Sequence, residues 1–265
     1  MSAEAPHPSL PSAADVAFAQ RLADAAGAAI RPHFRRLAGL DLKDDDSPVT
    51  VADRAAETAM RGLISEERPD DGVLGEEFDP VAAAGDRLWV LDPIDGTRAF
   101  VAGKPTFTTL VALVIAGRPV LGIIDQPFIG ERWVGQDGGT TLNGEPITTR
   151  RGRGLAAAVI SATAPEQFET AADRAAFGRV QRAAASLSWG GDGYAYGLVA
   201  AGALDVVVET GLKTFDYCAV APVVAGAGGI VTDWTGQPLD LDSDGRIVAA
   251  GDAALHAQVL NELAG

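Results

Sequence analysis

Two carboxylates, a main-chain carbonyl and a hydroxyl are concentrated within six residues of this chain. Asp92, Asp95 and Thr97 supply the side chains, in a run that reads Leu-Asp-Pro-Ile-Asp-Gly-Thr over residues 91–97. Burying two acidic side chains costs free energy unless a cation lies between them. Oxygen ligands of this kind favour Mg²⁺, Mn²⁺ or Ca²⁺ over zinc or copper. The run therefore predicts a cation site, although Asp-Pro and Asp-Gly are also ordinary turn formers that bind nothing.

A buried strand and a short helix are expected to hold this run in place. The apolar residues 89–91 lead into it as a strand would. Pro93 fixes its own φ and biases Asp92 toward extended geometry, so we expect the strand to end at Pro93. A short helix is expected from Gly96 through Phe100, and its first amides could donate to a phosphate.

Other acidic residues extend the predicted site. Glu76, within Gly75-Glu76-Glu77, closes a strand predicted at 73–76, and Asp216 opens a helix predicted at 215–227. If these carboxylates converge with the first pair, they form a cage for more than one cation. Two ions about 4 Å apart can activate a water on one side of a phosphorus and stabilise the leaving oxygen on the other. The pattern predicts metal-assisted hydrolysis of a phosphate ester.

The remaining elements are expected in an order typical of layered helices and sheets. Helices are expected at 12–38 and from Thr50 to Glu67, where residues 50–53 fit a capping box. Strands then follow at 87–92, within 106–125 as a hairpin, and at 131–134 and 140–142. Beyond residue 150, strands are expected at 156–161, 204–209, 229–233 and 246–250, with helices at 171–185, 193–202, 215–227 and 252–263. This order predicts an α+β fold: a flexible tail over 1–11, then one domain over 12–265 whose two subdomains meet near residue 150.

Composition excludes several classes of partner. The chain has 36 acidic and 21 basic residues and a formal charge of −15, which opposes binding to nucleic acid or anionic membrane. Cys218 is the only cysteine, so no intrachain disulfide can form, and we expect a buried, inert thiol. No run approaches the ~20 apolar residues of a membrane span, and the N-terminal residues lack a signal-peptide core. We expect a soluble cytoplasmic protein.

Four motifs together resemble the inositol monophosphatase family: Thr-x-x-Asp at 50–53, Gly-Glu-Glu at 75–77, Asp-Pro-Ile-Asp-Gly-Thr at 92–97 and Asp-Tyr-Cys-Ala from residue 216. The resemblance covers about residues 12–265 and implies a sugar-phosphatase fold of alternating helix and sheet layers. It also implies two or three Mg²⁺ ions per site, with Mn²⁺ as an alternative, together with lithium sensitivity and a homodimer. Carried over by position, the metal ligands would be Glu76, Asp92, the Ile94 carbonyl, Asp95 and Asp216.

The same resemblance assigns catalytic roles to Asp53, Thr97 and Glu76. Thr97 and Asp53 would hold and polarise the attacking water. Asp53 also has a simpler interpretation, because a capping-box carboxylate needs no catalytic role.

Further segments resemble the histidinol-phosphatases within this family, at 97–100, 103–107, 122–127, 130–135 and 190–196. The substrate contacts implied are Asp95, Gly96, Thr97, Arg98, Gly191, Asp192 and Glu209. Anionic Asp192 and Glu209 would favour the cationic amine of histidinol phosphate over the neutral hydroxyls of inositol phosphate. The alternative is that Glu209 merely ends a strand and Asp192 caps a helix. Arg98 and Lys104 could steer the substrate, although a surface position fits Lys104 equally well.

The leading hypothesis is Mg²⁺-dependent hydrolysis of L-histidinol phosphate to L-histidinol and phosphate, a step of histidine biosynthesis. One alternative is a phosphatase of the same fold acting on inositol 1-phosphate or another small sugar or nucleotide phosphate. A second is a non-catalytic module that binds metal or phosphate. The polar loop over 41–48 is a candidate lid.

Overall fold

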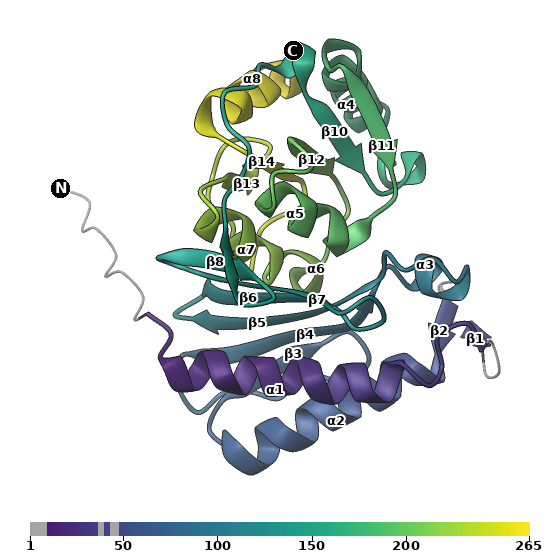
Figure 1. Ribbon diagram of the computed structural model, residues 1–265, viewed down its shortest axis with the longest axis vertical. Coiled ribbons are helices and arrows are strands. Elements are labelled where there is room, and N and C mark those ends of the chain that lie inside the picture. The colour runs from purple at the N-terminus through teal and green to yellow at the C-terminus, as the bar shows by residue number, and fades with distance from the viewer. Residues whose placement is uncertain (1–9, 37–39, 43–47) are drawn as a thin grey trace.

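The computed structural model describes residues 10–36, 40–42 and 48–265 of the 265-residue chain. Helices and sheets alternate in layers along the long axis of the molecule (Figure 1). Helices α1 (Ala13–Ile30) and α2 (Val51–Glu67) cover the outer face of a seven-stranded sheet. Helices α5 (Asp192–Ala200), α6 (Thr214–Tyr217) and α7 (Val220–Gly226) separate this sheet from a five-stranded one. Helices α4 (Ala171–Ala183) and α8 (Ala253–Ala264) close the far end.

The larger sheet has the strand order β3-β4-β5-β6-β7-β8-β9, in which β3 is parallel to β4 and all other pairs are antiparallel. Its strands are Gly72–Gly75, Arg87–Asp95, Thr108–Ile115, Arg118–Gln126, Glu131–Gln136, Gly139–Leu142 and Glu145–Ile147. The predicted hairpin within 106–125 is confirmed. Its turn places Ala116 at φ 50° and Gly117 at φ 78°, the left-handed pair that fits the twist of a two-residue hairpin.

The smaller sheet has the order β11-β10-β12-β14-β13. Its strands in chain order β10 to β14 are Val159–Ala162, Ser186–Trp189, Val206–Glu209, Ile230–Asp233 and Ile247–Ala250. Strand β10 is parallel to both neighbours, whereas β14 is antiparallel to β12 and β13. The short strands β1 (Leu40–Leu42) and β2 (Pro48–Thr50) pair with each other, and α3 (Thr97–Val101) follows β4. Two 3₁₀ turns lie at Leu155–Ala157 and Pro165–Gln167.

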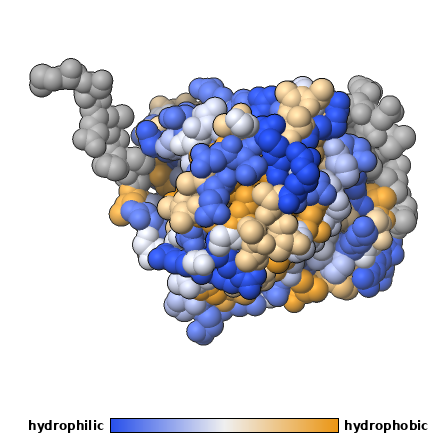
Figure 2. Space-filling model, turned by 90° about the horizontal axis from the view of Figure 1, so that it is seen from above, coloured by the Kyte–Doolittle hydropathy of each residue, from blue (hydrophilic) through white to orange (hydrophobic). Residues whose placement is uncertain are grey.

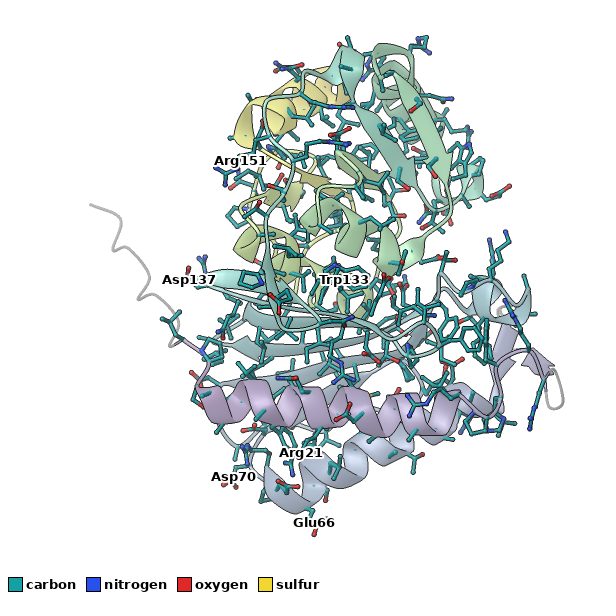
Figure 3. All side chains as sticks on the ribbon, in the orientation of Figure 1. Arg21, Glu66, Asp70, Trp133, Asp137 and Arg151 are labelled. Carbon is teal, nitrogen blue, oxygen red and sulfur yellow. The ribbon has the colours of Figure 1, made fainter. Side chains whose placement is uncertain are left out.

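Three apolar cores hold the layers together. In the first, between α1, α2 and the larger sheet, Phe18 meets Trp89 edge to face with ring centroids 5.2 Å apart. The second lies between the two sheets and contains Trp133, visible there in Figure 3, and the buried Cys218. The third lies under α4 and α8. The outer surface at that end is largely hydrophilic, with smaller apolar patches (Figure 2).

The first helix is shorter than predicted. It ends at Ile30 rather than near residue 38, and residues 31–35 form turns. Arg31 still has helical φ and ψ, but Pro32 has no N–H with which to continue the helical hydrogen bonds. The bonding changes accordingly, because the His33 amide donates to the Ile30 carbonyl at 2.9 Å, a tighter turn than the α-helix. Phe34 is thereby directed into the first core.

Other elements also differ from the predictions. Strand β4 does not end at Pro93 but continues to Asp95. The helix predicted at 215–227 is divided into α6 and α7, because Pro222 cannot donate to the Cys218 carbonyl as a continuous helix requires. Strand β11 was not predicted at all: its Ser-Leu-Ser-Trp sequence does alternate polar and apolar residues, but four residues are the shortest length at which such a pattern indicates a strand.

Two predictions concern the ends and borders of the fold. The candidate lid and the N-terminal tail fall largely on residues 43–47 and 1–9, which lie outside the described residues. The division into subdomains near residue 150 stays a prediction. Within the described ranges, no helix combines the length and the apolar character that crossing a bilayer requires.

Candidate metal centre and substrate pocket

A bulge in β4 brings Asp92 and Asp95 to the same side of the sheet. Asp92 pairs with Leu110 of β5 and Asp95 pairs with Thr108, so β4 has one more residue than β5 in this stretch. In a regular strand, residues three apart point to opposite faces, and an extra residue reverses that relation. Pro93 lies inside the bulge, where a missing N–H costs no ladder hydrogen bond. The sequence Asp-Pro-Ile-Asp therefore lies within an irregular stretch of β4 and does not follow the end of the strand.

The turn after β4 fixes the rest of the run. Gly96 has φ 81° and begins α3 as its N-cap residue. A Cβ at Gly96 would lie 2.8 Å from Asp192 Oδ2, so glycine is required by both the backbone and the neighbour. Thr97 Oγ1 donates to the Ile94 carbonyl at 3.1 Å. That carbonyl keeps a second lone pair that could ligate a cation.

One group of three carboxylates forms around this run. Oxygen atoms of Asp92, Asp95 and Asp216 lie within 4.8 Å of one another. Asp216 reaches the group from the first turn of α6, where its Oδ2 accepts the Lys213 amide at 2.6 Å. Asp95 Oδ2 accepts bonds from the Gly193 amide and the Thr108 hydroxyl. Strand β4 and two helices of the middle layer thus converge at this point.

A second group contains Asp53, Glu76 and Glu77, again with oxygens within 4.8 Å of one another. Asp53 lies in the first turn of α2, and the two glutamates follow β3. Glu77 was not among the predicted site residues, although it directly follows Glu76 in the sequence. The negative charge of Glu76 raises the pKa of both Asp92 and Asp216, so the two groups act on each other electrostatically.

Glu57 accepts a hydrogen bond from this second group and, like Glu77, was not among the predicted site residues. It is fully buried on α2, one helical turn after Asp53. Its Oε2 accepts the Glu77 amide at 2.8 Å, while its Oε1 accepts Arg61 Nε at 2.7 Å. A Cβ on Gly75 would collide with the Glu57 carboxylate, which explains the glycine before the two glutamates. The four-residue spacing from Asp53 is the only sequence signal that could have found Glu57.

The electrostatics of the first group favour a bound cation. Desolvation, followed by the charges of Glu76 and other carboxylates, raises the pKa of Asp92 well above its ordinary value. Desolvation raises the pKa of Asp216 to about 7. Asp92 Oδ1 is buried and has no hydrogen-bond partner among the described residues. Carboxylates that are costly to ionise alone become favourable ligands once positive charge is present.

The donor set of both groups fits hard divalent cations. All six side chains offer carboxylate oxygen, and neither group includes histidine or cysteine. Mg²⁺, Mn²⁺ and Ca²⁺ prefer such ligands. The predicted ligands Glu76, Asp92, Asp95 and Asp216 are therefore brought together in two adjoining groups, with Glu77 as an addition.

A cavity of about 340 Å³ opens beside the first group. Its wall contains predicted site residues from β4, α3, α5, β12 and α6, namely Asp95, Arg98, Asp192, Glu209 and Asp216. Gly96, Thr97 and Gly191 adjoin these residues in the chain but do not line the cavity. Besides Gly193 and Tyr196 of α5, the remaining wall comes from two segments that no prediction included, residues 163–169 and 210–212.

Glu209 and Asp192 differ in how their charges are compensated. Glu209 ends β12, and it is buried with Oε1 accepting the Thr163 amide at 2.9 Å and Oε2 accepting the Tyr196 hydroxyl at 2.8 Å. Burial nevertheless raises its pKa. Desolvation and the charge of Glu209 raise the pKa of Asp192 to about 6, while Arg98, Thr163 and Lys104 act in the opposite direction.

The alternative interpretation of Asp192 as a helix cap is not supported at the N-cap position. Gly191 occupies the N-cap of α5, and Asp192 is the first helical residue. Its φ of 43° is unusual for a residue with a side chain. Lys104 is exposed but close enough to act on the Asp192 carboxylate.

The layered fold and the two carboxylate groups define a metal-dependent phosphatase. The profile of the inositol monophosphatase family matches residues 13–264, and the chain belongs to that family. A chloroplastic bifunctional phosphatase of Arabidopsis thaliana is 44% identical, over 93% of this chain and 74% of its own length. The histidinol-phosphatase of Chlorobaculum parvum is 36% identical, over 89% of this chain and 92% of its own.

Solved structures agree with this assignment. An inositol monophosphatase from Zymomonas mobilis has a TM-score of 0.87 and 48% sequence identity, over 96% of this chain and 100% of that one. The inositol monophosphatase of Thermotoga maritima has a TM-score of 0.83 and 28% identity, over 94% of this chain and 96% of that one. The predicted sugar-phosphatase fold, the family and the phosphoric monoester hydrolase class are thus confirmed.

The raised carboxylate pKa values predict an unusual pH dependence of stability without metal. In EDTA, we expect the thermal midpoint to rise as the pH falls from about 8 to about 5.5. A carboxylate whose folded pKa exceeds its unfolded value binds extra protons in the folded state, so its stabilising protonation is lost as pH rises through the folded pKa. The window follows from Asp216 at about 7 and Asp192 at about 6.

Scanning calorimetry in EDTA and in saturating Mg²⁺ measures this effect. Mg²⁺ should raise the midpoint most at pH 8 and least at pH 5.5, because bound cations compete with protons for the same oxygens. In the difference between the midpoints with Mg²⁺ and with EDTA, the contributions of groups outside the site cancel. One such group is His256, whose pKa is lowered by burial. A Mg²⁺ effect that is absent, or equal at both pH values, would contradict the prediction.

Proposed function

We propose that this chain hydrolyses L-histidinol phosphate to L-histidinol and phosphate in a Mg²⁺-dependent reaction. The observation that carries the proposal is the charge of the cavity wall. Asp95 and Asp216 of the first carboxylate group line the cavity beside one basic residue, Arg98. The wall also has four further acidic side chains, those of Glu166, Glu169, Asp192 and Glu209. Such a wall favours a substrate whose end remote from the phosphate is cationic.

The similarity to named relatives supports the same substrate. Besides the Chlorobaculum parvum protein, the histidinol-phosphatase of Streptomyces coelicolor is 34% identical over 94% of this chain. A nucleotide with several phosphates would place negative charge against the acidic wall, which disfavours it. An inositol phosphate would offer only neutral hydroxyls to the same carboxylates.

The residues of the two groups divide the chemistry between them. In the proposed mechanism, the cations would be held by Asp92, Asp95, Asp216, Glu76, Glu77 and the Ile94 carbonyl. Bound Mg²⁺ supplies Lewis-acid activation of water and of the phosphate ester. Thr97 and Asp53 would position the attacking water, and Asp53 would accept its proton as the new oxygen–phosphorus bond forms. The bond between phosphorus and the ester oxygen breaks, and the released alkoxide takes a proton from solvent water. Gly96, Thr97 and Arg98 contact the phosphate, and Asp192 with Glu209 forms the floor for the amine end.

Phosphate release from purified protein tests the proposal. With Mg²⁺, we expect kcat/KM for histidinol phosphate to exceed that for inositol 1-phosphate by at least about tenfold. The deaminated analogue of histidinol phosphate is the matched control, because it keeps the imidazole and loses the ammonium. Removing metal with EDTA should abolish release from every substrate, and added Mg²⁺ should restore it.

Two results would contradict different parts of the proposal. Activity that survives EDTA would overturn the metal mechanism, and equal or faster turnover of inositol 1-phosphate would overturn the substrate. A homodimer, lithium inhibition and a cytoplasmic location stay predictions.

A further inference from the structure

We propose that Glu166 and Glu169, at the rim of the cavity, bind the cationic end of the substrate and give the enzyme its selectivity for amines. This inference rests on the proposed function and adds two specificity residues to it. Both side chains line the cavity, and both residues are exposed to solvent. A substrate whose phosphate lies at the carboxylate groups would extend its other end toward this rim.

Hydrogen bonds to the cavity wall fix the first part of the segment 163–169, which carries the two glutamates. The Thr163 amide donates to Glu209 Oε1 at 2.9 Å, which joins the start of the segment to the end of β12. The Thr210 hydroxyl donates to the Gln167 carbonyl at 2.6 Å, within the same cavity wall. The Ala164 amide is bonded in turn to Gln167 Oε1 at 3.1 Å. These bonds hold the backbone around Glu166 in one position.

Helix α4 fixes the other end of the segment. Arg174 Nη1 donates to the Phe168 carbonyl at 2.8 Å and to the Glu169 carbonyl at 2.6 Å. The buried Phe168 ring stacks on Phe177 of α4 with centroids 4.1 Å apart. The backbone beneath both carboxylates is therefore ordered before substrate binds, which reduces the entropy cost of binding.

Other protein groups already engage the remaining acidic side chains of the cavity. Asp95 and Asp216 belong to a carboxylate group that fits a cation, and both oxygens of Glu209 accept hydrogen bonds. The charge of Asp192 is opposed by nearby Arg98 and Lys104. Within the described part of the chain, the carboxylates of Glu166 and Glu169 make no hydrogen bond or ion pair with another residue. They are consequently the acidic groups of this wall whose charge is least engaged by other protein groups, and they add to the contribution of Asp192 and Glu209.

The expected effect is moderate and confined to binding. An exposed ion pair changes affinity by up to about fivefold, so two pairs that each contribute roughly threefold predict about a tenfold effect together. Neither glutamate belongs to the carboxylate groups that would activate water. Removing their charges therefore weakens binding of the substrate and of the transition state by the same amount. Such a loss raises KM and leaves kcat unchanged.

The test compares Glu166→Gln/Glu169→Gln with the unchanged enzyme in Mg²⁺. We expect KM for histidinol phosphate to rise about tenfold at constant kcat, with KM for inositol 1-phosphate unchanged or lower. High salt should reduce the difference between the two enzymes, because exposed charges are screened. Each single variant should show part of the effect, and thermal midpoints should stay the same.

The matched control is Glu66→Gln/Glu145→Gln, which makes the same chemical change and the same change in net charge. Glu66 lies on the exposed side of α2, at the opposite end of the molecule from α4 (Figure 3), and Glu145 is exposed at the start of β9. This control should leave KM for histidinol phosphate unchanged. A rise equal to that of the test variant would mean a general charge effect and would overturn the inference.

The outcomes separate this inference from the proposed function. An unchanged enzyme that shows no preference for histidinol phosphate refutes the proposed function, and the inference with it. A preference that the double variant retains in full refutes the inference alone. Equal losses of kcat on both substrates would indicate a structural role for the segment and would likewise refute it.

Discussion

Asp92→Asn is expected to lower kcat/KM by about 10³-fold while raising the thermal midpoint of the metal-free protein. The two effects have one cause. Asp92 is buried, and desolvation together with the charges of Glu76, Asp95, Asp216 and Asp53 raises its pKa. A neutral amide of the same shape removes that repulsion and can donate to a neighbouring carboxylate. The same change removes a ligand oxygen from the group that fits a cation.

Calorimetry and phosphate-release kinetics on the same preparation measure both effects. The midpoint in EDTA at pH 8 should rise, and the further increase on adding Mg²⁺ should shrink. Asp205→Asn is the matched control, because Asp205 is equally buried but pairs with Arg150 at 2.7 Å and accepts the Val159 amide at 2.7 Å. Its removal should lower the midpoint and spare activity. A lowered midpoint in Asp92→Asn would show that the carboxylate stabilises the metal-free fold, contrary to our account.

Asp53→Asn should lower kcat by about 10²-fold at saturating Mg²⁺, the usual contribution of a positioned general base. Asp53 is 1% exposed in the first turn of α2, and its group includes Glu76 and Glu77. An asparagine can still accept a main-chain hydrogen bond at this position, but it cannot take a proton from water. The loss should therefore appear in turnover and not in the folding of α2.

Steady-state kinetics and thermal midpoints distinguish this role from helix capping. Asp70→Asn, an exposed change just beyond the same helix, is the control and should alter neither quantity. If Asp53→Asn kept turnover within a few fold while the midpoint dropped, the carboxylate would serve the helix rather than the reaction. The capping partner Thr50 lies among residues whose side chains are not described.

Local patterns predicted most of the elements and failed where backbone bonding depends on a single proline. The turns at Ala116-Gly117 and Asn143-Gly144 were found because left-handed φ values are tied to a few residue types. The ends at Ile30 and Tyr217 were missed because apolar periodicity continues through Pro32 and Pro222 while the hydrogen bonds do not. Strand β11 gave only a four-residue alternation as a signal, and its pairing with β10 is what establishes it as a strand.

The sequence by itself determined the kind of chemistry, because the donors that define it are close together in the chain. Asp92, Asp95 and Thr97 lie within six residues, and oxygen ligands specify hard cations whatever the fold around them. The tertiary structure decided which side chains share a space. The bulge in β4 turned Asp92 and Asp95 to one side of the sheet. Packing of α2 brought Asp53 and Glu57 to Glu77. Hydrogen bonds to β12 and α4 placed the segment 163–169 at the cavity. Contacts between residues so far apart in the sequence depend on the packing of whole layers, and no local spacing in the chain encodes them.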